Sequence, residues 1–533
     1  MGRTRYLLGV LALAACGDNR LGPMPVDGAT DGRHDARVDA PIDAPPDAPP
    51  DAPPDGPPGE GPTITPGASD RILLIGTLVT PATVIDGELL VVGDHIACMG
   101  NAGDCATTTD GVGATVINTH GIIAPGLIDT HNHILFDMFD NDDWLPLQLY
   151  DDHEQWTSET RYAAMLDVKQ CLVNDSQGKP AWCANTPYGS AAGSLRCEVD
   201  KYGELKGLVA GTTSIVGLPG TSSACFGSLA RSVDVSQNGL GQDKIQTSAT
   251  FPPSNGTGVC TNIAAGKTDA FLVHVGEGTD ARALGEFARL GSSTTPPNCL
   301  YAPQTTITHG VAFTAAEFQT MAAAGMKLTW SPQSNVSLYG ATADIPTALA
   351  AGVTVALGPD WSMGGSQNML DEMRFANMWD DTHWSNQLAA KDIVTMATTH
   401  GAQVLALDDR LGSLAVGKLA DIAVFSGDVT QPYDAILAAK PKQVELVMVG
   451  GTVLYGDAVL SAAGPAAPGC ETIDICGASK FLCVATSTTT SKLNQTYSDI
   501  TTALSTALDA ADAATPGDGY TFAPLTPLAT CAP

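Results

Sequence analysis

The chain has 533 residues, of which 44% are hydrophobic and 16% charged, a composition typical of a globular protein with a large core. Its formal net charge of −31 at pH 7 argues against nucleic acid or anionic lipid as an electrostatic partner. The charge does not identify a substrate, because solvated surface accounts for most of such charge in globular proteins.

The N-terminus has the pattern of a secretory signal. Arg3 and Arg5 precede the apolar run YLLGVLALAA, which is too short to cross a bilayer. The LAAC that ends at Cys16 resembles a bacterial lipobox, whose cysteine is lipidated. We predict a lipoprotein signal peptide over residues 1–16 and export to a bacterial envelope, periplasmic or at the cell surface; a plain cleaved signal peptide is the alternative. The predicted membrane contact is this N-terminal lipid anchor only.

The cysteines agree with export. Of the 13 cysteines, twelve remain after the anchor, an even number that suits disulfides in an oxidising compartment. Close spacings, such as Cys98 to Cys105, suggest local disulfides, although the sequence does not fix connectivity. No pair has the C-x-x-C spacing, which disfavours a thiolate zinc site.

The following segment, residues 17–68, is predicted to be a disordered linker rich in proline and aspartate. An aspartate recurs at every fourth position from Asp27 to Asp55, ending in DAPPDAPPDAPPDG. Proline favours extended geometry, at about 3.1 Å per residue, and the like charges repel one another. This segment therefore reads as a stiff spacer between a membrane and a folded body.

Strand and helix patterns alternate from about residue 70 onward. RILLIGTLVTP and GELLVVGDHIACMG alternate like strands, and GIIAPGLIDTHNHI follows. Short apolar strands (GLVAGTTSIVG, DAFLVHVGEG, TTITHG, MKLTWSPQSN, TVALGPDW) then alternate with helical stretches such as DARALGEFARL and TAAEFQTMAAAG. This order predicts an α/β fold with a closed (β/α)8 TIM barrel over residues 123–412. No confident fold follows for the Cys-containing C-terminal extension, residues 461–533.

Polar residues lie at the ends of these strands. His131 and His133 are two positions apart, so both side chains point to the same face of a strand. The carboxyl ends of barrel strands meet at one mouth, so the polar set there should converge. That set is His131, His133, His274, Glu277, His309 and Asp360. The remaining histidines are interpreted as structural: His34, His95, His120, His153, His383 and His400.

These residues and the motifs APGLIDTHNH, HVGE, THGVAFTAAEF, SPQSN, ALGPDWS and GSLAVGKLADIAVF resemble the amidohydrolase superfamily over residues 71–460. The resemblance is strongest to the branch with guanine deaminases, S-adenosylhomocysteine deaminases and triazine hydrolases. It implies a small composite β-sandwich from residues 69–122 and 413–460. It also implies a hydrolase acting on non-peptide carbon–nitrogen bonds, by heterocycle deamination or cyclic amide hydrolysis, with a small-molecule substrate.

The resemblance further implies one divalent metal ion, Zn2+ with Fe2+ as the alternative, and a water made more acidic by that charge. The implied ligands are His131, His133, His274 and Asp360. Glu277 would shuttle protons, Asp360 would relay one to the leaving amine, and His309 would donate a hydrogen bond to the oxyanion or the water.

Two other functions stay open at this stage. A prolidase-like dipeptidase would hold two metals, in some relatives bridged by a modified lysine, but Lys244 in QDKIQTSATF begins its strand rather than ending it. A non-catalytic surface-binding lipoprotein would have lost a ligand or the proton shuttle, and none of these is missing here. A homo-oligomer is compatible with the sequence.

Substrate contacts are the least defined feature. Trp144, Asn335 and Trp361 follow strands and are candidate pocket residues. FDMFDNDDW could form an acidic rim, although a solvated charge run is the simpler interpretation. Arg231 could meet a substrate carboxylate. The cysteine-bearing insertion near residues 171–197 could reshape the mouth, so the substrate is not transferred from any relative.

Overall fold

The computed structural model describes residues 61–175, 178–217, 229–234, 244–465, 469–485, 494–515 and 519–531. The predicted signal peptide and residues 17–60 of the predicted linker lie outside the described residues. In the described part of the chain, no helix is both long and apolar enough to cross a membrane.

Parallel strands form the centre of the molecule, in a five-stranded sheet (β9 to β13) and a three-stranded sheet (β6 to β8). The strand bounds are β6 Leu127–Asp129, β7 Thr212–Ile215, β8 Arg231–Ser232, β9 Ile245–Ser248, β10 Ala270–Val275, β11 Thr305–His309, β12 Lys327–Trp330 and β13 Thr354–Leu357. The two sheets meet where Asn132 and Asp360 form a parallel bridge. No ladder joins β8 to β9 among the residues described. The predicted α/β fold with parallel strands is confirmed.

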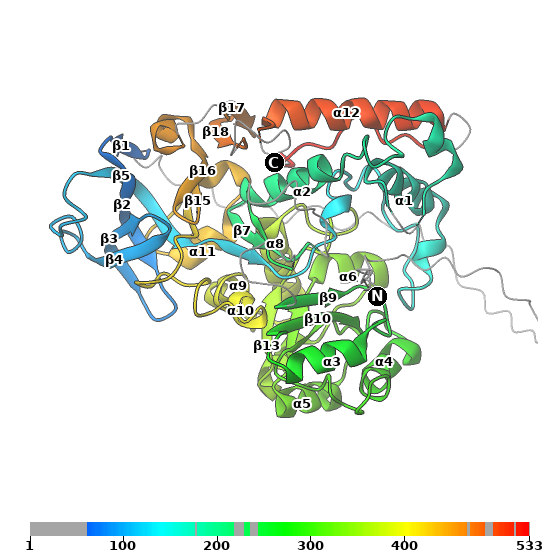
Figure 1. The fold of residues 1–533 in the computed structure, drawn as a ribbon. Helices are drawn as coiled ribbons and strands as arrows, with labels where there is room; N and C mark the ends of the chain where they lie inside the picture. The colour runs from blue at the N-terminus through cyan, green and yellow to red at the C-terminus, as the bar shows by residue number, and fades with distance from the viewer. Residues whose placement is uncertain are drawn as a thin grey trace, which may run out of the picture.

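Helices follow the strands and cover them (Figure 1). Local sequence fixes their ends: Asp280 caps α4 through the amide of Ala283, and α5 stops at Gly325, whose φ of 70° suits glycine. The helices of this region are α1 Thr160–Leu172, α2 Arg196–Leu208, α3 Gly256–Ala264, α4 Ala281–Ser292, α5 Ala315–Ala324, α6 Pro332–Tyr339, α7 Ile345–Ala351, α8 Met369–Trp379, α9 Ala390–Met396 and α10 Thr399–Val404.

A ten-stranded sheet lies beside the barrel, and segments from both ends of the chain build it (Figure 1). Its N-terminal strands are β1 Thr63–Thr65, β2 Ala68–Val79, β3 Val84–Val92, β4 His95–Asn101 and β5 Ala114–Pro125. After the barrel come β14 Ile422–Phe425, α11 Pro432–Ala438, β15 Val444–Val449 and β16 Thr452–Asp457. Because β14 pairs with β5, which leads directly into β6, the sheet and the first barrel strand are continuous. The predicted domain boundaries stay predictions.

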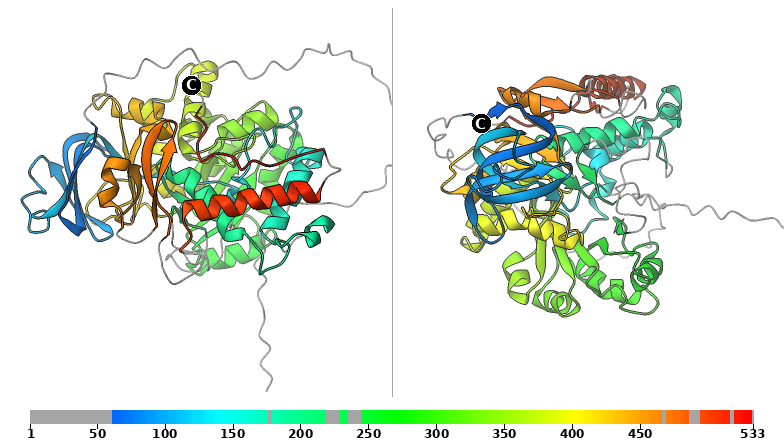
Figure 2. Two further views of the ribbon diagram at one scale, coloured as in Figure 1. Left: turned by 90° about the horizontal axis from the view of Figure 1, so that it is seen from above. Right: turned by 60° about the vertical axis from the view of Figure 1, so that its left-hand side comes forward.

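The C-terminal extension joins both parts of the molecule. Strands β17 Cys470–Ile475 and β18 Ala478–Cys483 complete the ten-stranded sheet, and α12 Tyr497–Ala514 lies along α2 (Figures 1 and 2). The hydroxyl of Tyr202 on α2 donates to the carbonyl of Thr526. The extension is thus part of the folded body.

Five disulfides lie within the described residues. Three close short loops of 7 to 13 residues, as the close cysteine spacings suggested, and two join more distant segments. The pairs are Cys98–Cys105, Cys171–Cys183, Cys260–Cys299, Cys470–Cys483 and Cys476–Cys531.

Candidate metal centre

The ends of four barrel strands bring the predicted polar residues together. His131 and His133 follow β6, His274 lies in β10, His309 ends β11, and Asp360 follows β13. All are buried except His133, whose side chain keeps 20% of its exposure. The centre therefore opens to solvent on the His133 side.

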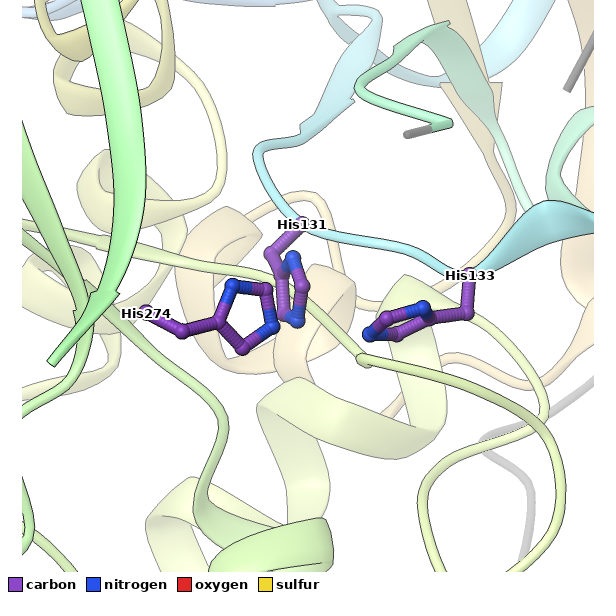
Figure 3. A group of neighbouring side chains, drawn as sticks. All are labelled: His131, His133 and His274. Atoms are coloured by element: carbon purple, nitrogen blue, oxygen red, sulfur yellow. The ribbon is translucent and has the colours of Figure 1, made fainter. Parts of the chain in front are cut away.

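Three imidazoles converge on a common space (Figure 3). His131, His133 and His274 each offer a ring nitrogen, and these atoms lie within 4.8 Å of one another. The ring centroids of His131 and His274 are 4.6 Å apart, and those of His131 and His133 are 5.1 Å apart. Nitrogens this close can share one cation.

Asp360 adds a carboxylate to this cluster. Its Oδ1 lies 2.9 Å from Nε2 of His131 and 3.4 Å from Nε2 of His133. Asp360 and His309 both have a left-handed backbone, with φ of 73° and 76°. Non-glycine residues adopt this conformation at a cost of order 1–3 kcal/mol, and such residues gather at functional sites.

Two buried imidazole nitrogens, Nε2 of His274 and Nε2 of His309, indicate what kind of ligand the centre can bind. Nδ1 of His274 lies 3.0 Å from the carbonyl of Ser248, and Nδ1 of His309 lies 2.9 Å from Oδ1 of Asn335. Both oxygens are acceptors, so each Nδ1 carries the proton and each Nε2 presents a lone pair. Neither Nε2 has a hydrogen-bond partner among the described residues. A divalent cation, or a water beside it, would satisfy these nitrogens, so the residues fit a metal.

The pKa shifts agree with ligand behaviour. Burial lowers the pKa of His133 to about 3 and that of His274 well below its usual value, and burial also lowers the pKa of His131. Burial opposes ionisation of Asp360, but the neighbouring imidazoles, His131 first, bring its pKa below the usual range. Neutral imidazoles and an ionised carboxylate are the forms that bind metal.

Glu277 follows β10, and its carboxylate lies beside His309. Its Oε2 lies 3.7 Å from Nε2 of His309, while its Oε1 accepts a hydrogen bond of 2.7 Å from the hydroxyl of Tyr339. The carboxylate is buried, with 6% exposure. One oxygen is thus held by the protein, and the other is directed toward His309.

Helix α6 contacts three groups of the centre. Ser334 donates to Oδ2 of Asp360, Asn335 accepts from His309, and Tyr339 donates to Glu277. The sequence prediction included Asn335 as a substrate contact and omitted Ser334 and Tyr339. The available signal was the SPQSN motif directly after β12, because a helix that begins at a strand's carboxyl end starts at the mouth.

Residues 150–153 cross the mouth beside Glu277. The amide of Tyr150 donates to the carbonyl of Leu338, and the amide of His153 donates to the carbonyl of Glu277. His153, interpreted as structural from the sequence, pairs with Glu286 at 3.1 Å. Although burial opposes it, the hydrogen bond to Glu286 and nearby carboxylates raise the pKa of His153 to about 9.

Aromatic rings enclose the open side. The ring of Trp361 lies 5.5 Å from that of His133, between centroids, and its Nε1 is buried without a hydrogen-bond partner in the described structure. Trp144 lies one ring further out, 5.8 Å from Trp361, and its Nε1 donates to Glu159. Of the two predicted tryptophans, Trp361 therefore stands next to the centre.

The acidic segment FDMFDNDDW is only in part a solvated charge run: Asn141 and Asp142 are exposed, but two of its acids are not. Asp137 and Asp143 are buried with the surrounding aromatic residues. Burial raises the pKa of Asp137 to about 6 and that of Asp143 to about 7. The apolar residues of the segment are all buried and bring these two acids inside with them, which a count of charges does not detect; they are Phe136, Met138, Phe139 and Trp144.

Two cationic candidates lie away from the centre. Arg231 begins β8 and forms a two-pronged pair with Asp421, with N–O distances of 2.8 and 3.0 Å, so this arginine is engaged inside the protein. Lys244 precedes β9, bonds the carbonyl of Gly266 and pairs with Asp269 at 3.0 Å. Neither takes part in the metal cluster.

Comparison with known proteins shows which family and which enzymes this chain is similar to. Residues 263–454 match the amidohydrolase family model. A 5-methylthioadenosine/S-adenosylhomocysteine deaminase of Desulforudis audaxviator is 35% identical over 166 residues, which are 29% of this chain and 38% of that enzyme. A 5'-deoxyadenosine deaminase of Methanothermobacter thermautotrophicus is 25% identical over 432 residues, covering 74% of this chain and 95% of the enzyme.

Among solved structures, the zinc complex of atrazine chlorohydrolase from Arthrobacter aurescens superposes with a TM-score of 0.53. It covers 74% of this chain and 97% of its own, at 17% identity, so the likeness is one of fold. The family match includes His274, Glu277, His309 and Asp360. The chain therefore carries an amidohydrolase family domain.

Proposed function

We propose that this protein is a metal-dependent hydrolase that cleaves a non-peptide C–N bond of a small heterocyclic molecule. Deamination of a ring and opening of a cyclic amide are the two candidate reactions. The observation that carries the proposal is the pair of buried Nε2 atoms of His274 and His309, which lack a hydrogen-bond partner among the described residues and lie beside Asp360 and Glu277. The deaminases and triazine hydrolase among its relatives support the bond type.

The proposed ligands of one divalent ion, taken as zinc, are His131, His133, His274 and Asp360. When bound, the ion supplies positive charge that makes a nearby water more acidic. The zinc in the related atrazine chlorohydrolase structure supports this choice. A dipeptidase with two ions would need a further bridging ligand, and Lys244 is engaged elsewhere.

The chain's carboxylates divide the proton transfers. Glu277 takes one proton from the attacking water and delivers it to the ring nitrogen of the substrate. Asp360 accepts the second proton and passes it to the leaving amine. In deamination, two protons leave the water, one reaches the ring nitrogen and one the leaving amine, so the products are the carbonyl compound and ammonia. In the opening of a cyclic amide, the ring nitrogen is itself the leaving amine and takes both protons, so the product is an open-chain ammonium carboxylate.

For His309 we propose a role different from the donor role expected from the sequence. With its proton on Nδ1, its Nε2 accepts a hydrogen bond from water rather than donating one. His309 thus orients the water opposite Glu277, and it donates only if the ring takes a second proton.

The direct test is a screen of the zinc-loaded protein against nucleobases, hydantoin-like rings and dipeptides, with release of ammonia or amine and metal content as readouts. We expect turnover of a heterocycle with about one ion per chain. Dipeptide cleavage with two tightly bound ions would favour the dipeptidase. Metal binding without turnover on the whole panel would favour the non-catalytic binding lipoprotein.

We also propose export and lipid anchoring at Cys16, which lies outside the described residues. The five disulfides among the described residues support an oxidising compartment. Labelled palmitate should be incorporated in a bacterial host, and Cys16→Ser should abolish both the label and membrane association. Retained label in that variant would contradict this site.

A further inference from the structure

Tyr339 ends α6 and makes the contact that holds Glu277 in place. Its hydroxyl lies 2.7 Å from Oε1 of Glu277, and both residues are buried, with 4% and 6% exposure. Buried polar atoms in such contact restrict one another strongly, because no water competes for them.

The direction of this hydrogen bond is fixed by Trp156. The Nε1 of Trp156 lies 3.0 Å from the hydroxyl oxygen of Tyr339. An indole nitrogen only donates, so the oxygen of Tyr339 accepts there and its single proton goes to Glu277. Burial, and next the charge of Glu277, raise the pKa of Tyr339 well above its usual value, so the donor keeps its proton.

Because of these hydrogen bonds, the two carboxylate oxygens of Glu277 have different neighbours. Oε1 is occupied by Tyr339, and Oε2 lies on the side of His309, 3.7 Å from its Nε2. The terminal torsion of a glutamate is otherwise broad, so the carboxylate plane would be poorly defined without an anchor. A general base must present one oxygen along the path of the proton.

We propose that Tyr339, oriented by Trp156, is a positioning residue that fixes the carboxylate of Glu277 so that Oε2 alone faces the reacting molecules. This proposal rests on the proposed function, in which Glu277 moves the proton. Tyr339 is not among the proposed metal ligands, and its hydroxyl is engaged by Glu277 and Trp156.

The kinetic test compares Tyr339→Phe with the wild type, using the substrate found in the screen. The variant keeps the ring and loses the hydroxyl. We expect kcat to fall about 10- to 100-fold, the range for losing a partner that orients an active-site ligand. KM should change less than twofold, and zinc content should not change, because Glu277 is not a proposed ligand.

Combining two substitutions distinguishes a positioning role of Tyr339 from a packing role. Trp156→Phe should lower kcat in the same direction by a smaller factor. The double variant should be no slower than Tyr339→Phe alone, because both changes break one chain of hydrogen bonds. Tyr202→Phe is the matched control: it removes a buried hydroxyl bonded to Thr526, so it should lower the Tm and leave kcat unchanged. An unaltered kcat in Tyr339→Phe, or multiplying effects of the two changes, would overturn the proposal.

A structural readout keeps this test independent of turnover. Crystal structures of the wild type and Tyr339→Phe should show one orientation of the Glu277 carboxylate in the first and several, or a rotated one, in the second. A single unchanged orientation in both would refute the positioning role even if no substrate were found. A wild type without turnover but with the expected rotation would instead refute the proposed function.

Discussion

Two buried polar clusters in this molecule are satisfied in different ways. Arg231 and Asp421 bind one another through two contacts, and Asp421 also accepts from the amide of Gly450, so the pair is complete within the protein. In the candidate metal centre, His274 and His309 each end in a nitrogen without a partner in the described structure. Of these two clusters, the first is complete by itself and serves the fold, whereas the second is left open for a ligand.

Removal of a ligand from the candidate metal centre should have the largest effect on turnover. His274→Ala removes one of the proposed metal donors, so we expect bound zinc to fall well below one ion per chain and turnover to fall to that of the chelated protein. Metal analysis and ammonia release measure both. Full zinc content with full turnover would show that His274 is not a ligand.

Glu277→Gln should separate chemistry from metal binding. The amide keeps the size of the carboxylate and cannot accept the proton, so kcat should drop about 10²- to 10⁴-fold. Zinc content should stay as in the wild type. Turnover close to the wild-type rate would remove Glu277 from its proposed role.

Arg231→Met should affect only the cluster formed by Arg231 and Asp421. It leaves Asp421 buried without its charged partner, and because Arg231 is about a quarter exposed, at 28%, we expect a loss of about 1–3 kcal/mol in the free energy of unfolding. The measurement is denaturant unfolding, with kcat of the folded protein unchanged. A large loss of kcat at wild-type stability would mean that Arg231 serves the reaction.

The last effect concerns pH, and its sign is opposite for two histidines at the mouth, His133 and His153. Burial lowers the pKa of His133 in the folded state to about 3, so the metal-free protein should lose stability as pH falls from about 6.5 toward 3, where the unfolded chain binds more protons. His153 has a raised pKa of about 9, so its contribution is present below about pH 6.5 and is lost as pH rises through 9.

Unfolding of the metal-free protein across this pH range tests both signs. His153→Gln should flatten the alkaline limb alone. Stability that rises on acidification below pH 6 would contradict the assignment for the centre.

The sequence predicted the parts of the fold with strong local signals. β10 and β13 are mostly apolar, and residues of the centre lie in or shortly after β10, β11 and β13; the parallel order of these strands follows from the helices between them. β8 has only two residues, Arg231–Ser232, which is too short for any periodic pattern. α12 was not predicted, since its place depends on packing against α2, a polar helix that is nevertheless buried.

In the candidate metal centre, too, some residues have a local sequence signal and others depend on tertiary packing. Its six polar residues could be named because each stands at a strand end, a position that the chain order reveals. Tyr339 and Trp156 could not, because their contacts with Glu277 and with each other depend on how α6 and residues 150–158 fold. The buried acids of FDMFDNDDW were misjudged because burial is a tertiary property.

The proposed hydrolase activity depends most on one cation lying among His131, His133, His274 and Asp360. Anomalous scattering at the zinc edge, from crystals of the zinc-loaded protein, tests this directly. We predict a single peak with ligand distances of about 2.0–2.2 Å to three imidazoles and the carboxylate. A peak elsewhere, two peaks in the mouth, or none would contradict the account.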